Sequence, residues 1–193
     1  MIILTAGHTG PNTGATGTVV EPYGRLDEGT ETIRLRNRVA EILSEKWGIV
    51  VLLDHDNERL GILTDRINRL ASESDLCLDL HLNSHPNQNA NGTEVIIAND
   101  ASDYEITVAV KLLNATAKSL KTNIRGLKSE SETPHQRLAM LHLNCQNLIL
   151  EVCFCTNPND GKSYHSNFEQ LAQAIAHTLA ENIVTTQYIP HRP

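Results

Sequence analysis

The chain has few aromatic residues, no block of basic residues and no long apolar run. Aromatic residues make up only 4% of its 193 residues, which argues against a surface that stacks nucleic-acid bases. The formal net charge is −7, and Lys and Arg are scattered along the chain. This pattern gives no electrostatic footprint for nucleic acid or for an anionic membrane. No apolar run approaches the roughly 18 residues that cross a bilayer, so we expect neither a nucleic-acid partner nor a membrane partner.

The first residues also lack the features of a secretory signal peptide. Met1 leads straight into the apolar residues 2–4, with no basic segment before them and no small-residue cleavage site after them. We therefore expect synthesis in the cytoplasm without a signal peptide.

Cysteine is present but does not form a disulfide pattern. Three of the four cysteines lie in or beside apolar runs, and their spacing is not that of a small disulfide framework. We expect free, buried thiols. Cys153 and Cys155 form a C-x-C pair that could bind metal, but no second pair completes a thiolate site.

Short apolar runs alternate with segments of helical periodicity. The expected strands lie at about 2–4, 49–53, 76–81, 95–97 and 148–154, and the expected helices at about 28–47, 60–71, 102–120 and 168–183. This alternation predicts a three-layer α/β fold with a mostly parallel, mixed central sheet of about six strands and helices on both faces. The length suits one domain, residues 1–184, followed by a loose tail, residues 185–193.

Two polar loops, at about 7–27 and 81–92, follow directly on expected strands. Sites in open α/β sheets gather beyond the carboxyl ends of the strands, so both loops should border one crevice. His8 and His81 stand at the ends of two strands, and Glu28 begins a helix. Two histidines and a carboxylate match a catalytic zinc with an open water position. Alternatively, each His is a hydrogen-bonded structural residue and Glu28 favours the helix N-terminus.

Glu151 interrupts the apolar strand LILEVCF. An unpaired, ionised carboxylate inside a strand costs several kcal/mol, so Glu151 needs a partner such as a metal-bound water or a cation. Beside a zinc-bound water it would be placed as a general base. A salt bridge to an arginine is the alternative interpretation.

Four segments, taken together, resemble a known family. They are GHTGPNTGATG, DEGTETIRLRNRVAEIL, DLHLNSHPNQNANGTEVII and ILEVCFCTNPND, and they span the chain from Ile2 to about Val184. In this order they resemble the catalytic domain of zinc-dependent N-acetylmuramoyl-L-alanine amidases, which occur in bacterial cell-wall hydrolases and phage endolysins. The chain departs from the family pattern at Thr5-Ala6, at Gly29 and at Cys153, but none of these departures removes a proposed ligand or base.

The resemblance implies roles for individual residues. His8, Glu28 and His81 would hold one zinc ion per chain, and Glu151 would be the catalytic general base. Glu21 and Glu31 compete with Glu28 for the carboxylate position. Glu21 precedes Pro22 and Gly24, however, and Glu31 would lie one turn into the helix.

The resemblance also implies an activity. The enzyme would cleave the amide bond between N-acetylmuramic acid and the L-alanine of the stem peptide with a zinc-activated water. Its substrate would be peptidoglycan or a muropeptide. We expect the enzyme to be a monomer that acts on the cell wall, after release in the manner of a phage endolysin. The alternatives are another zinc hydrolase, a peptidase or deacetylase, and an inactive wall-binding module.

Two further residues are candidates for support of the site. Asp79 lies two residues before His81, hence on the same strand face, and could orient a ligand histidine; a plain buried, hydrogen-bonded carboxylate is equally compatible with the pattern. Asn83 is expected to fix the loop that follows. The other histidines that we considered belong to no motif and are treated as background: His85, His135, His142 and His165.

Overall fold

The computed structural model describes residues 1–8 and 13–187. The strands are β1 (Ile2–Ala6), β2 (Val19–Val20), β3 (Gly24–Arg25), β4 (Val51–Leu53), β5 (Leu76–Asn83), β6 (Thr93–Ile97), β7 (Ile124–Ser129) and β8 (Gln146–Phe154). The α-helices are α1 (Glu28–Trp47), α2 (Leu60–Leu70), α3 (Asp103–Leu120), α4 (Pro158–Ser166) and α5 (Phe168–Gln187). Two short 3₁₀ turns, η1 (Glu130–Glu132) and η2 (Ala139–Leu141), follow β7.

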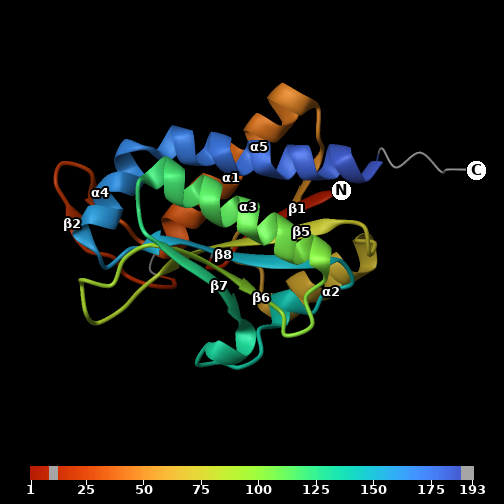
Figure 1. The fold of residues 1–193 in the computed structure, drawn as a ribbon, viewed down its shortest axis with the longest axis horizontal. Helices are drawn as coiled ribbons and strands as arrows, with labels where there is room; N and C mark the ends of the chain where they lie inside the picture. The colour runs from red at the N-terminus through yellow and green to blue at the C-terminus, as the bar shows by residue number, and fades with distance from the viewer. Residues whose placement is uncertain (9–12, 188–193) are drawn as a thin grey trace, which may run out of the picture.

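Six strands form one mixed sheet in the order β4-β1-β5-β8-β6-β7. Every neighbouring pair is parallel except β6 and β8, which are antiparallel. Strands β2 and β3 form a separate small hairpin. The three-layer α/β architecture with a mostly parallel sheet is therefore confirmed (Figure 1).

Helices cover both faces of this sheet because each expected helix has one apolar stripe. Helices α1, α3 and α5 pack together on one face, where α5 contacts both of the others. Helix α2 and the turn η2 pack on the other face, around Ile3, Cys77 and Ile149. Figure 1 shows the first group above the sheet and α2 below it. The second layer is smaller, which leaves part of that face of the sheet open.

The helix ends agree with the sequence signals. Gly48 ends α1 in the left-handed conformation, with φ of 64°, as expected for glycine at a helix C-terminus. Ser102 begins α3 with a capping box to Glu105. Helix α5 continues to Gln187, so the first three residues of the expected tail are helical; residues 188–193 lie outside the described residues.

Several elements differ from the sequence predictions. The hairpin strands β2 and β3, strand β7 at the sheet edge and helix α4 were not expected. Strand β5 continues two residues beyond His81. All four cysteines are buried and free, as predicted. No helix in the part of the chain that the structure describes is long and apolar enough to span a membrane.

Candidate metal centre

Three expected ligands meet at one edge of the sheet. His8 follows β1, His81 lies near the end of β5, and Glu28 is the first residue of α1. One donor atom from each lies within 4.8 Å of the other two. Glu28 Oε1 is 3.1 Å from His81 Nδ1, and Glu28 Oε2 is 3.9 Å from His8 Nε2. The arrangement brings two imidazoles and one carboxylate to a common point, the donor set that tetrahedral zinc prefers when one position stays open.

Glu28 is held in its ionised form. Its carboxylate is buried, and it accepts hydrogen bonds from the backbone N–H groups of Ala15 (2.7 Å) and Leu82 (3.1 Å). Burial opposes ionisation, but the contact with His81 and the Ala15 N–H outweigh it, so the pKa of Glu28 lies below its usual value. A fixed, negatively charged carboxylate at this point suits a cation.

Asp79 contacts the ring of His81. Asp79 Oδ2 lies 3.0 Å from His81 Nε2, and Asp79 Oδ1 accepts a hydrogen bond from Thr5 Oγ1 at 2.6 Å. When Nε2–H donates to Asp79, Nδ1 is the nitrogen left to bind a metal. Thr5, at one of the positions where the chain departs from the family pattern, thus donates to the carboxylate that contacts His81 Nε2.

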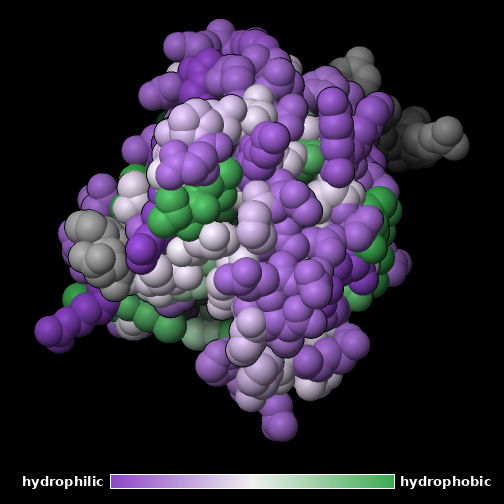
Figure 2. Space-filling model, turned by 90° about the vertical axis from the view of Figure 1, so that its left-hand side faces the viewer, coloured by the Kyte–Doolittle hydropathy of each residue, from purple (hydrophilic) through white to green (hydrophobic). Residues whose placement is uncertain are grey.

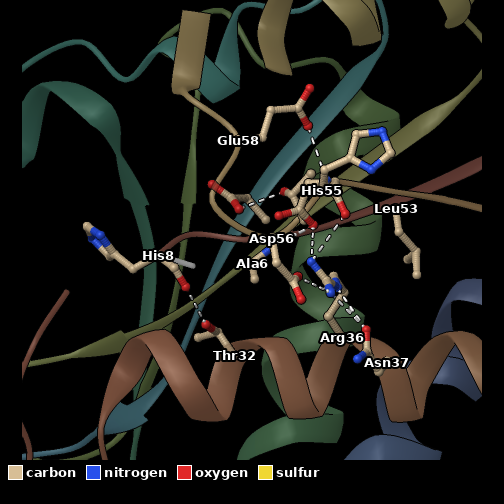
Figure 3. Close-up of polar contacts among 12 residues, drawn as sticks. Ala6, His8, Thr32, Arg36, Asn37, Leu53, His55, Asp56 and Glu58 are labelled. Atoms are coloured by element: carbon tan, nitrogen blue, oxygen red, sulfur yellow. Dashed lines mark hydrogen bonds and ion pairs between the residues drawn. The ribbon is translucent and has the colours of Figure 1, made fainter. Parts of the chain in front are cut away.

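The backbone on both sides of Gly7 is fixed to α1. Arg36 of α1 is buried and donates from Nη1 to Asp54 Oδ1 at 2.7 Å, and the same oxygen accepts from Ala6 N at 3.2 Å. Thr32, one turn earlier on α1, donates to the backbone carbonyl of His8 at 3.1 Å. In Figure 3 the imidazole of His8 points away from the Arg36 cluster. The anchoring therefore uses the main chain of His8 and leaves its half-exposed ring for the centre.

Gly7 is required by its close approach to His81. A Cβ atom on Gly7 would lie 2.0 Å from both Cε1 and Nε2 of the His81 ring. No such contact is sterically possible, so a larger residue must displace the ring from Asp79 and Glu28.

We therefore expect Gly7→Ala to weaken zinc binding by about 10- to 100-fold, the usual effect of disturbing a group that orients a ligand. Competition with a chromogenic chelator measures this change. Gly61→Ala is the matched control, because a Cβ there meets nothing within 4 Å. Unchanged zinc affinity in Gly7→Ala would show that the ring does not need its present position.

Glu151 lies beside the three ligands on the next strand. It pairs in register with His81 of β5, and the two side chains share a face of the sheet. Its Oε2 atom is buried and has no hydrogen-bond partner among the described residues. Burial raises the pKa of Glu151 to about 7; the charge of His81 opposes this shift, and Glu28 and Glu94 add to it. A buried carboxylate oxygen without a partner, next to a His/Glu/His donor set, fits a metal ion with a water between them.

The raised pKa predicts a stability effect in metal-free protein. The folded state holds the Glu151 proton up to about pH 7, whereas an ordinary glutamate releases it near 4.5. The folded state thus binds more protons between these values, and the free energy of unfolding falls as the pH rises through them. Glu151→Gln should remove this loss and raise the free energy of unfolding at pH 8 by about 1–3 kcal/mol.

Urea unfolding of chelator-treated wild type and variant at pH 5 and pH 8 tests this prediction. The gain from Glu151→Gln should shrink at pH 5, where the folded wild type is already protonated. The exposed carboxylate of Glu73 supplies a control, Glu73→Gln, with no expected change. Equal free energies of unfolding for wild type and Glu151→Gln at pH 8 would contradict the predicted effect of the Glu151 pKa.

A cleft of about 910 Å³ contains the centre. It is lined by His8, Glu28, His81 and Glu151, and it extends along the open sheet face toward β7 and the segment 132–140. Figure 2 views the molecule from the side where α4 and the β5–β6 loop lie in Figure 1. That face is mostly hydrophilic, with small hydrophobic patches. Such a surface suits a polar, extended substrate.

The other candidates lie elsewhere. Glu31 pairs with Arg34 at 3.1 Å, and Glu21 is an exposed residue at the β2–β3 turn. Neither belongs to the cluster of metal-type donors found among the described residues. Of the three glutamates considered, Glu28 is the one in that cluster. Asn83 donates from Nδ2 to Glu94 Oε1 at 2.7 Å, and its Oδ1 accepts from Ser84 N at 2.8 Å.

The background histidines divide into two groups. His142 contacts Glu130 at 2.9 Å, and His85 Nδ1 accepts from the N–H of Asn87. His165 stacks against Tyr23. None of these three lines the cleft, whereas His135 does.

Sequence reasoning missed Glu94. This buried glutamate pairs in register with Glu151 across the antiparallel β6–β8 contact. It lines the cleft together with Lys128, which lies 3.0 Å from Glu94 Oε2. The signal that pointed to Glu151, a carboxylate within an apolar strand, is also present in the segment TEVII.

Asp160 holds together the segments around the carboxyl edge. Its Oδ2 accepts from the N–H groups of Gly92 (2.8 Å) and Phe154 (2.9 Å), and its Oδ1 accepts from Thr122 Oγ1 (2.9 Å). Asn157 caps α4 by accepting from the N–H of Asp160 at 3.0 Å. The segment TNPND thus fixes the loop after β5 to the end of β8, which keeps the wall of the cleft in place.

Comparison with known proteins gives a family match over nearly the whole chain. A family model described as N-acetylmuramoyl-L-alanine amidase matches residues 2–181. The motif residues 9–12 fall within that match but lie outside the described residues. A germination-specific N-acetylmuramoyl-L-alanine amidase of Bacillus subtilis (strain 168) is 24% identical over 174 residues, which cover 83% of this chain and 69% of that protein.

Solved structures share the fold. An N-acetylmuramoyl-L-alanine amidase from Clostridium difficile 630 superposes with a TM-score of 0.75 at 19% identity, covering 95% of this chain and 96% of that one. The catalytic domain of the CD27L endolysin, which targets Clostridia difficile, gives a TM-score of 0.71 at 21% identity, with 93% and 96% covered. At these sequence identities the superpositions support a shared fold only.

Proposed function

The chain belongs to the N-acetylmuramoyl-L-alanine amidase family, and on this premise we propose that it cleaves its substrate with a zinc ion held by His8, Glu28 and His81. The bond that is hydrolysed joins N-acetylmuramic acid to the L-alanine of the peptidoglycan stem peptide. The observation that carries the zinc proposal is the donor set itself, whose atoms converge within 4.8 Å beside the unpartnered Oε2 of Glu151.

Each residue of the centre has a distinct task in this proposal. Glu28 contributes the negative charge that favours a cation, and the two imidazoles complete the ligand set. Asp79 holds the Nε2–H of His81, so that Nδ1 faces Glu28 and the site. Bound zinc supplies Lewis acidity, which makes water more acidic and polarises the amide carbonyl.

Glu151 handles the protons. In the metal-free protein burial raises the pKa of Glu151 to about 7. The positive charge of a bound zinc ion would lower that pKa and favour the carboxylate form that accepts a proton. The carboxylate accepts a proton from the attacking water. It then delivers that proton to the nitrogen of the departing L-alanine, so that the peptide leaves as a neutral amine. Burial of Oε2 keeps this exchange away from bulk solvent.

One chain contains all of these residues, and we propose that the enzyme acts on the cell wall as a monomer with one zinc ion per chain. The catalytic unit is taken as residues 1–184. Helix α5, which continues to Gln187, packs against α1 and α3.

Product analysis tests the proposed function. Purified peptidoglycan is digested with the zinc-loaded protein, and the soluble products are identified by mass spectrometry and N-terminal analysis. Free stem peptides beginning with L-alanine are expected. Cleaved cross-links would instead indicate a peptidase, released acetate a deacetylase, and binding to the wall without any product an inactive module.

A further inference from the structure

The cleft has a second, basic part that the metal centre does not use. On the side of β7 it is lined by Lys128, His135 and Arg137. This is notable in a chain whose formal net charge is −7. Cations gathered at one end of a cleft attract anionic groups of a ligand.

The sheet register places this basic part on the same floor as Glu151. Ile149 of β8 pairs with Ile96 of β6, which pairs with Lys128 of β7. Residues in register share one face, and Glu151 lies two residues beyond Ile149 on that face. Lys128 therefore lies two strands across and two residues along from Glu151. With strands about 4.8 Å apart and a rise of about 3.3 Å per residue, the two Cα atoms are roughly 12 Å apart.

The charge on Lys128 is only partly neutralised. Glu94 accepts from Arg125 Nε at 2.6 Å and lies 3.0 Å from Lys128 Nζ. Its other oxygen accepts from the amide of Asn83 at 2.7 Å. Two cations therefore share one carboxylate, which leaves one positive charge at this side of the cleft.

Arg137 adds a second unneutralised cation. It is exposed and lines the cleft, and its guanidinium makes no hydrogen bond or ion pair with the part of the chain that the structure describes. Its segment is nevertheless well anchored. Glu130 is 1% exposed and accepts from Leu138 N and His142 Nε2, each at 2.9 Å. The buried Glu130 thus holds the backbone next to Arg137 in place.

One carboxylate, Glu132, also lines this part of the cleft. Its Oε2 accepts from the backbone N–H of Ser129 at 2.8 Å within the cap of η1. Among the residues that line this part of the cleft, Lys128 and Arg137 stand against Glu94 and Glu132. Arg125 pairs with Glu94 from outside the lining and brings the region to an excess of one positive charge. An arginine without a partner can bind a carboxylate through two parallel hydrogen bonds.

We propose that Arg137 and Lys128 form a subsite for a free carboxylate on the second residue of the stem peptide. This proposal rests on the amidase function above. An extended peptide advances about 3.3 Å per residue. The carboxylate of the second residue lies one to two residues beyond the cleaved bond. The long side chains of Lys128 and Arg137 reach toward it, so peptide and side chains together bridge the roughly 10 Å between Glu151 and β7. The stem peptide then runs from Glu151 toward β7 along the sheet floor.

Two synthetic substrates test the subsite. Both are N-acetylmuramoyl-L-alanyl tripeptides ending in L-lysine, and they differ only in the second residue, which is D-glutamate with a free carboxylate or D-isoglutamine with a carboxamide. The zinc-loaded wild type is expected to favour the carboxylate roughly tenfold in kcat/KM, mainly through KM, as a charged hydrogen bond provides. Arg137→Gln should lose this preference, falling roughly tenfold on the carboxylate substrate and less than twofold on the carboxamide.

Controls separate the possible results. Arg69→Gln removes an exposed cation at the end of α2 and should leave both substrates unaffected. Lys128→Met should also reduce the preference, because it removes the second cation. A wild type that hydrolyses both substrates equally, or an Arg137→Gln that loses the same factor on both, overturns the subsite and leaves the amidase function standing. A wild type that hydrolyses neither overturns the amidase function and the subsite with it.

Discussion

Glu151→Gln is expected to reduce kcat by about 10²- to 10⁴-fold, the usual contribution of a positioned acid or base. Glutamine has the shape of the carboxyl group but cannot accept the proton of the attacking water. The centre itself should survive, because none of its contacts among His8, Glu28 and His81 involves Glu151 as a hydrogen-bond partner. The variant should therefore retain about one zinc ion per chain and remain folded.

Turbidity loss of a wall suspension, together with metal analysis of the same samples, measures both quantities. Glu73→Gln alters an exposed carboxylate away from the cleft and should keep full activity. Normal lysis by Glu151→Gln would show that another group accepts the proton. Loss of zinc from the same variant would instead place Glu151 among the ligands.

His81→Ala is expected to remove zinc and abolish activity together. His81 supplies one of three ligands, and its loss also leaves Asp79 buried without its imidazole partner. The decrease in zinc affinity should exceed the 10- to 100-fold effect of changes that only disturb ligand orientation. Activity should fall to the background rate at every zinc concentration that keeps the protein soluble.

Metal content after gel filtration, and titration with a competing chelator, give the affinity. His85→Ala is the matched control, because His85 is an exposed histidine in the loop after β5. Among residues 1–8 and 13–187 its hydrogen bonds are to Asn87 of the same loop and to Thr156. A His81→Ala protein that still binds one zinc ion with unchanged affinity would refute the ligand set. A fall in thermal stability without loss of zinc would do the same.

The centre could be located from sequence because its members stand at the ends of elements. His8 follows the apolar strand β1, His81 lies near the end of the apolar strand β5, and Glu28 begins an amphipathic helix. Parallel strands bring their carboxyl ends to one edge, so the proximity of these residues follows from topology. Asp79 could be predicted as well, because residues two apart on a strand share a face. Its contact with Thr5 depends on the β1–β5 register, which a single sequence does not reveal.

Strand β7 and helix α4, which were not predicted, lack a strong periodic signal in the sequence. Strand β7, IRGLKS, contains two basic residues and a glycine, and no residue in it is fully buried. Edge strands are often short and charged, which weakens apolar alternation. Helix α4, PNDGKSYHS, depends on tertiary contacts and on its Asn157 cap rather than on an apolar stripe. The basic part of the cleft went undetected because Lys128 lies on that edge strand.

The reversed direction of β6 has a consequence for how this fold can diversify. Because β6 runs antiparallel to β8, Glu94 lies at the start of β6 and pairs in register with Glu151 of β8. The connection from Asn83 to Thr93 therefore begins two residues after His81 and ends one residue before Glu94, so both of its ends lie beside the cleft. Insertions or deletions in this one connection reshape the entrance of the cleft while both strands keep their pairing. An exchange of this loop would change the cleft wall next to Asn83 and Ser84 while His81 and Glu151 keep their places on paired strands.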